Sequence, residues 1–152
     1  MSCSNDLEAR IGYLEDIEAI RGVIATYVYT LDGGDFDRLM TIYQPDAHFV
    51  IDAFQVDVNS ADAIKATLMG MCQAYRNMSH KIINIDVDPK SGTGRAYFLF
   101  TCIDVAQNQG MIGEGDYRYK FTKVDGQWKL SEQLIHIAYL SPAPWPMEFP
   151  AA

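Results

Sequence analysis

The first part of the chain carries apolar residues at the spacing of a helix. From about Asp6 to Leu31 they recur every three or four residues, which places them on one helical face. The positions are Leu7, Ile11, Leu14, Ile17, Ile20, Ile24, Tyr27 and Leu31. Gly33 and Gly34 follow and predict the helix end, because glycine readily adopts the left-handed conformation found there.

Two shorter helices are predicted next. Residues 35–43 form a short helix that Pro45 stops, and residues 47–52 follow as a strand. A third helix is predicted over 61–75, with Ser60 as its N-cap, because a serine hydroxyl can accept a hydrogen bond from the first turn.

The second half of the chain changes to alternating, β-branched and aromatic sequence typical of strands. Asp125-Gly126 is a strong hairpin signal within it. Helices followed by an antiparallel meander predict an α+β fold, in which a curved antiparallel sheet wraps around three N-terminal helices and forms a cone-shaped pocket. The predicted strands lie near 80–88, 94–106, 112–124 and 127–140.

The length of 152 residues predicts a single domain over 1–152, with its core over 6–140. Residues 141–152 contain four prolines and are expected to form an irregular tail. Its large apolar side chains, Trp145, Met147 and Phe149, are expected to pack on this subunit or on a neighbour.

Composition narrows the partners. The net charge of −8 and the lack of a basic run argue against nucleic acid, because phosphate binding needs clustered lysine and arginine. No apolar stretch approaches the ~18 residues of a membrane span, and no signal peptide is visible. Cys3, Cys72 and Cys102 are odd in number, so we expect free thiols in the reducing cytoplasm. No metal-ligand spacing and no phosphate-binding loop occur, so no metal or cofactor is expected.

The candidate chemistry centres on Asp32 and His80. Asp32 closes the first helix, where a negative charge is unfavourable without a partner, and His80 opens a strand-like run. A carboxylate that reaches a histidine fixes its tautomer and stabilises the charge that the ring gains on taking a proton. Tyr27 could donate a hydrogen bond to a substrate oxygen. The alternatives are a core tyrosine, a solvated carboxylate and a structural histidine, and contact within the pair depends on tertiary geometry.

Five further residues are candidates for the pocket wall. Phe100 and Asp104 share one face of a predicted strand, and Tyr117 and Tyr119 share a face of the next. His136 lies in the last strand. Asp104 could instead be a surface acid, and His136 a packed histidine.

Several segments together resemble SnoaL-like proteins of the nuclear transport factor 2-like superfamily. The chain is most similar to the branch that holds bile-acid dehydratase, scytalone dehydratase and hexachlorocyclohexane dehydrochlorinase. The segments that carry the resemblance are 16–21, 31–33, 35–39, 45–47, 79–80 and 124–128.

The resemblance implies site residues and a reaction. The branch uses an aspartate at the end of the first helix and a histidine at a strand start, which match Asp32 and His80, 48 positions apart. Tyr27 matches the phenol of the dehydratases, whereas the dehydrochlorinase has lysine there. The second histidine of scytalone dehydratase has no clear match, since Asp104 is the polar residue nearest that place. The implied protein is a cofactor-independent lyase, in which His80 removes a proton from carbon and Tyr27 polarises a carbonyl or assists departure of hydroxide.

Two other functions fit the same resemblance. One is an isomerase similar to ketosteroid isomerase, with Tyr27 as oxyanion donor, Asp104 as a neutral acid and Asp52 as the base. The other is a non-catalytic protein that binds ligands or serves as the small subunit of a ring-hydroxylating dioxygenase. By analogy, the substrate is expected to be small, apolar and cyclic. Relatives in this branch form dimers or trimers, and a homotrimer is expected here.

Overall fold

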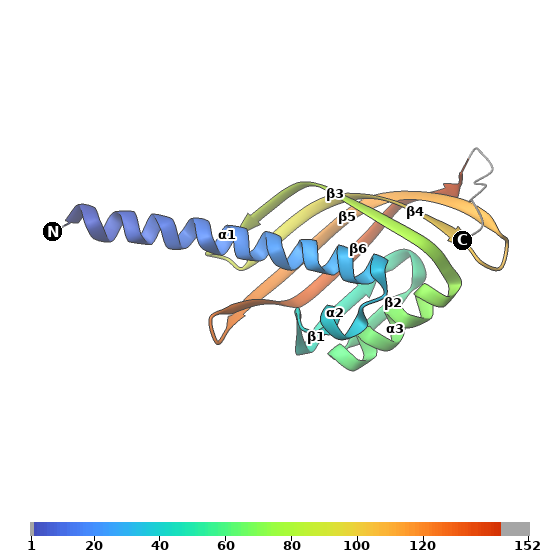
Figure 1. Ribbon diagram of the computed structural model, residues 1–152, viewed down its shortest axis with the longest axis horizontal. Coiled ribbons are helices and arrows are strands. Elements are labelled where there is room, and N and C mark those ends of the chain that lie inside the picture. The colour runs from blue at the N-terminus through green and yellow to red at the C-terminus, as the bar shows by residue number, and fades with distance from the viewer. Residues whose placement is uncertain (1, 144–152) are drawn as a thin grey trace.

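The computed structural model describes residues 2–143, and the remainder of the predicted tail lies outside this range. A six-stranded curved sheet in the order β2-β1-β6-β5-β4-β3 is covered on one face by the helices (Figure 1), as the predicted α+β cone requires. The elements are α1 (Ser2–Gly33), α2 (Phe36–Met40), β1 (Tyr43–Ile51), η1 (Asp52–Phe54), β2 (Val56–Asn59), α3 (Ala61–Ala74), β3 (Tyr75–Asp88), β4 (Thr93–Asp104), β5 (Gln109–Val124) and β6 (Gln127–Pro142).

Helix α1 is longer than its core-facing stripe. Ile20 and Ile24 are fully buried, but Leu7 and Leu14 near the other end are 55% and 62% exposed. The first turns of α1 project beyond the sheet (Figure 1). The predicted apolar stripe is therefore a core face only in the second half of the helix, which is the half that carries the candidate site residues.

The end of α1 is fixed by glycine. Gly34 has a φ of +71°, and its N–H donates to the Leu31 carbonyl over 3.2 Å. The Asp35 N–H donates to the Thr30 carbonyl over 2.9 Å, which completes the Schellman pattern. This stop places Asp32 in the last turn, at the end of the helix that faces β3.

The meander β3–β6 is antiparallel, and the predicted hairpin at Asp125-Gly126 is confirmed by positive φ values at both residues. One strand pair departs from the predicted antiparallel sheet, because β1 lies parallel to β6. The whole meander separates these two strands in sequence, so no hairpin constrains their relative direction.

Two strand starts and one short strand are the main differences from the sequence prediction. Strand β1 begins at Tyr43, and Pro45 lies in it where the pairing with β6 is interrupted, so the missing N–H costs no ladder bond. The four-residue strand β2 was not predicted. Strand β3 begins at Tyr75 instead of residue 80, since its first residues are polar and hide the strand pattern.

Strand β3 is bent by two irregularities. The register with β4 shifts between Arg76 and Ser79, around Asn77 with a φ of +52°, and again beyond Ile83, around Asn84 with a φ of +54°. An extra residue in a strand reverses which side chains face the core. The first shift thus directs Met78 and His80 inward, so the interior position of His80 depends on it.

Candidate functional site

A cavity lies between the end of α1, helix α3 and the sheet, with about 610 Å³ of space unoccupied by atoms, its open mouth included. Its wall is mostly aliphatic, aromatic and sulfur-containing, and among the described lining residues none is lysine or arginine. A neutral apolar molecule suits such a wall. The lining residues are Tyr27, Leu31, Ile51, Phe54, Leu68, Met71, Tyr75, Met78, His80, Phe98, Phe100, Cys102, Tyr117, Ile135, Ile137 and Leu140.

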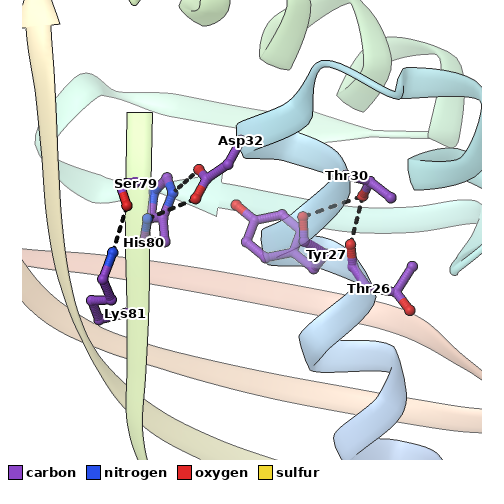
Figure 2. A network of polar contacts seen from close by, with 7 residues as sticks. All are labelled: Thr26, Tyr27, Thr30, Asp32, Ser79, His80 and Lys81. Atoms are coloured by element: carbon purple, nitrogen blue, oxygen red, sulfur yellow. Dashed lines mark hydrogen bonds and ion pairs between the residues drawn. The ribbon is translucent and has the colours of Figure 1, made fainter. Parts of the chain in front are cut away.

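The structure brings Asp32 and His80 together. One carboxylate oxygen of Asp32 lies 2.6 Å from His80 Nδ1, and the other accepts the backbone N–H of His80 over 2.7 Å (Figure 2). The side chains are 20% and 10% exposed, so solvent screens the pair little. Because the Asp32 carboxylate binds both the ring and the backbone N–H of His80, it ties His80 to the end of α1.

This contact decides which nitrogen serves the cavity. A carboxylate accepts hydrogen bonds, so Nδ1–H of His80 donates to Asp32, and in the neutral tautomer Nε2 is the nitrogen without a proton. The Phe100 ring stacks on the imidazole with centroids 5.4 Å apart and planes 18° apart. Asp32 therefore sets the tautomer of His80, and the Phe100 ring lies against one face of its imidazole.

Tyr27 lies one turn and a half earlier on α1 and is 2% exposed. Its hydroxyl faces the Asp32–His80 side of the site (Figure 2). Burial raises the pKa of Tyr27 well above its usual value, while the nearby Gln133 and Tyr117 side chains oppose the rise. The phenol therefore keeps its proton at neutral pH and can donate it in a hydrogen bond to a bound oxygen.

A buried polar cluster behind Tyr27 was not predicted. Gln133 of β6 is fully buried and accepts a hydrogen bond from the Tyr43 hydroxyl. Burial also raises the pKa of Tyr43, so this phenol is neutral too. No sequence signal marks Gln133, because it is one polar residue in a strand of mixed composition.

The five other candidate pocket residues fall into two groups, those that line the cavity and those that do not. Phe100 and Tyr117 line the cavity. Tyr119 is buried in the core, its hydroxyl without a partner among the described residues, and it is not part of the cavity wall. Asp104 accepts the Gln107 N–H over 3.0 Å in the turn after β4, so the surface-acid interpretation of this residue fits its position.

His136 also lies outside the cavity, because its neighbours Ile135 and Ile137 take the inward positions on β6. Its Nδ1 is hydrogen-bonded to Asp52, whose other oxygen accepts the Ile137 N–H over 3.2 Å. The side chains of His136 and Asp52 are 53% and 48% exposed. The isomerase alternative needs Asp52 in the pocket, whereas Asp52 points to the opposite face of the sheet.

Cys102 is the cysteine of the cavity wall, and burial raises the pKa of its thiol to about 11. Burial also raises the pKa of Cys72 on α3, so neither cysteine is a thiolate at neutral pH. Both are free cysteines. Within residues 2–143, no three His, Cys, Asp or Glu side chains come together as a metal site would need.

The family follows from the sequence match. Residues 12–133 match the SnoaL-like domain. The chain belongs to the SnoaL-like family. No curated protein matches it significantly. The matched range holds Tyr27, Asp32 and His80, so the whole arrangement around His80 lies inside the SnoaL-like domain.

Solved structures share the fold of this SnoaL-like domain. A hexachlorocyclohexane dehydrochlorinase, LinA type 2, aligns with a TM-score of 0.80 and 20% identity over 91% of this chain and 97% of that one. A candidate scytalone dehydratase from Novosphingobium aromaticivorans gives 0.76 and 25% identity over 91% and 92%. A candidate aromatic ring hydroxylase from the same species gives 0.77 and 18% identity over 86% and 94%.

In the described part of this SnoaL-like domain, no helix is long and apolar enough to cross a membrane.

Proposed function

We propose that this SnoaL-like protein is a cofactor-independent lyase of the dehydratase type, with His80 as the base, Asp32 as the residue that orients it and Tyr27 as the hydrogen-bond donor. The observation that carries the proposal is the double contact of Asp32 with the ring and backbone of His80, at the wall of an apolar cavity. The structural similarity to dehydratase-like and dehydrochlorinase proteins supports the reaction class.

The reaction would proceed by proton abstraction and elimination. His80 Nε2 takes a proton from the carbon next to a carbonyl, and the electron pair of that C–H bond forms a carbon–carbon double bond. The C–O bond on the neighbouring carbon breaks, and the leaving hydroxide accepts the proton from His80 to depart as water. Asp32 stabilises the imidazolium in between, and Tyr27 donates to the carbonyl oxygen as negative charge grows there.

The cavity favours a neutral, apolar, cyclic hydroxyketone. The described wall offers no cation to bind a carboxylate, a phosphate or a departing chloride. A phenol such as Tyr27 interacts best with oxygen. Loss of water therefore fits this cavity better than loss of chloride.

Deuterium exchange tests the base before the natural substrate is known. The purified protein is incubated in D₂O with a panel of cyclic β-hydroxyketones, and NMR follows both deuterium at the α-carbon and the appearance of the enone. We expect exchange and enone with the wild type, and neither with His80→Gln.

Three results would contradict the lyase. Exchange that survives in His80→Gln would show another base, and exchange without enone would favour an isomerase. Ligand binding with neither would favour a binding protein. Ser131→Ala, outside the cavity wall, is the matched control and should behave as the wild type.

We also propose that the protein forms a homo-oligomer through the outer face of the sheet. Tyr97 and Tyr139 are 57% and 51% exposed on this face. Asp116, the register partner of Tyr97, pairs with Arg118 over 3.2 Å. A surface that carries both signs of charge among apolar groups can face a copy of itself despite the net charge of −8.

Sedimentation equilibrium tests this association. We expect the wild type to have a mass that is a multiple of 17.1 kDa and Tyr97→Glu to shift it toward the monomer. Tyr29→Glu, on the exposed side of α1, should leave the mass unchanged. A monomeric wild type would contradict the proposal.

The cytoplasmic location expected from the sequence stays a prediction.

A further inference from the structure

Phe100 lies directly between two neighbours on one row of the sheet. In the registers of β3–β4 and β4–β5, Phe100 pairs with His80 on one side and with Gly113 on the other. Its ring stacks on the His80 imidazole. This row joins the proposed base to a glycine two strands away.

Gly113 leaves the space that the Phe100 ring occupies. A Cβ at Gly113 would lie 2.4 Å from Phe100 Cε1 and 2.9 Å from Cζ, far inside van der Waals contact. A glycine inside a strand often marks such a close approach, with an aromatic ring lying across it. Any other residue at 113 would push the Phe100 ring away from β5, in the direction of β3 and His80.

The neighbouring glycine has a different reason to be there. A Cβ at Gly115 would lie 1.9 Å from the backbone oxygen of His136, so backbone packing alone excludes a side chain at that position. At Gly113 the two nearest atoms belong to the Phe100 side chain. The Gly113 substitution therefore acts mainly on the ring, while the Gly115 substitution would also act on the sheet.

We propose that Gly113 and Phe100 are positioning residues that set the plane of the His80 imidazole, so that Nε2 faces the bound substrate. The catalytic part of this statement rests on the proposed function. Asp32 fixes which ring nitrogen carries the proton, but a single hydrogen bond to Nδ1 leaves the ring free to tilt about it. The Phe100 ring removes that freedom, because the two planes stack 18° apart.

A double-mutant cycle tests the proposal. Gly113→Ala should lower kcat roughly ten- to hundred-fold with little change in KM, because a base displaced by a fraction of an ångström transfers protons poorly. In a Phe100→Ala background the two nearest atoms are gone and only the Tyr139 backbone oxygen, at 3.0 Å, still meets the new Cβ. Gly113→Ala should therefore have a much smaller further effect. Gly22→Ala, with no atom within 4 Å of its Cβ, is the matched control and should leave kcat unchanged.

A second measurement does not depend on activity. The ring ¹⁵N signals of His80, which the ring current of Phe100 shifts little, should move in Gly113→Ala and in Phe100→Ala, but not in Gly22→Ala. Unmoved signals in both site variants would overturn the proposal whether or not the protein is a lyase. Moved signals in a protein that performs no exchange chemistry would support the positioning and contradict the lyase.

Two further outcomes are decisive. An equal loss of kcat from Gly113→Ala in both backgrounds would overturn the proposal, because the effect would not pass through Phe100. If Gly113→Ala does not fold, Phe100→Ala alone tests the point, and wild-type His80 signals in that variant would overturn it.

Discussion

Two aspartate–histidine pairs in this protein are built in nearly the same way. In each, one carboxylate oxygen contacts Nδ1 of the histidine and the other accepts a backbone N–H of the strand that carries it. Asp32–His80 lies at the cavity wall and is 20% and 10% exposed, whereas Asp52–His136 lies on the outer face and is about half exposed.

The comparison teaches that the hydrogen-bond pattern alone does not make a site. The inner pair adds what the outer pair lacks, namely an apolar cavity, a stacked Phe100 and the Tyr27 phenol nearby. Exclusion of water would strengthen the interaction of Asp32 with the charge that His80 gains in the proposed reaction. On the outer face, water and salt screen the same interaction.

Replacing the histidine of each pair should give the largest difference in activity between the inner and the outer pair. We expect His80→Gln to lower kcat for elimination by about 10²–10⁴-fold, the usual contribution of a general base. His136→Gln should change kcat less than two-fold. Steady-state assays on one substrate with both variants check this, and equal losses would refute the assignment of the base to the inner pair.

Replacement of the carboxylates by amides comes next. Asp32→Asn keeps the size of the side chain but removes the charge that stabilises the imidazolium, so kcat should fall about 10²-fold, with a change in the His80 ring ¹⁵N shifts. Asp52→Asn should leave both quantities as in the wild type. An Asp32→Asn enzyme of full activity would mean that the carboxylate has only a structural role.

Local signals in the sequence, a glycine stop after a helix and a strand-like run, pointed to Asp32 and His80 as candidates. Their contact depends on tertiary geometry and appears only in the structure. The inward direction of His80 depends on the irregularity around Asn77, whose positive φ no alternation pattern reveals. His136 was expected in the pocket because period two gives a face but not which face is inside. Asp104 does share the inward face of β4 with Phe100 and Cys102, but it lies at the strand end and accepts a hydrogen bond from the following turn.

The fold was predictable for similar reasons. The helices and the meander follow from periodicity and turns. The parallel β1–β6 pair and the short β2 come from tertiary pairing, which carries no local signal. The buried Gln133 and the rows that join His80, Phe100 and Gly113 depend on strand register, so they appear only in the structure.

Loss of the aspartate should also affect the unfolding free energy differently in the two pairs, but by less than it affects activity. Asp32→Ala leaves Nδ1 and the backbone N–H of His80 without their acceptor in a partly buried place, which should cost about 1–3 kcal/mol of unfolding free energy. Asp52→Ala should cost much less because solvent can replace the contact. Urea denaturation measures both, and an equal loss would show that burial does not distinguish the pairs.

The smallest expected effect is a pH dependence of the outer pair. Asp52 raises the pKa of His136, and His136 lowers the pKa of Asp52. The histidine contribution is complete below about pH 6.5 and is lost as pH rises through the folded pKa, while the carboxylate contribution is lost as pH falls through its own lowered pKa.

The stability difference between wild type and Asp52→Asn should therefore be largest between about pH 4 and 6.5, and should shrink on both sides. Thermal unfolding across this range checks it, and 0.5 M salt should weaken it. A difference that does not vary with pH would mean that the outer pair is not ionised as a pair.

Strand β3 ends the sheet, and the contact of Asp32 with the His80 N–H has a consequence for that edge. An unpaired edge N–H invites a strand from another molecule, which is how sheets grow into aggregates. The Asp32 carboxylate accepts the hydrogen bond of the His80 N–H in the middle of this edge strand, so that N–H is not free to pair with another chain. Asp32, proposed above to orient the base, therefore also covers a free donor of the edge strand. Variants that lose it should be examined for association of chains at high concentration as well as for lost activity.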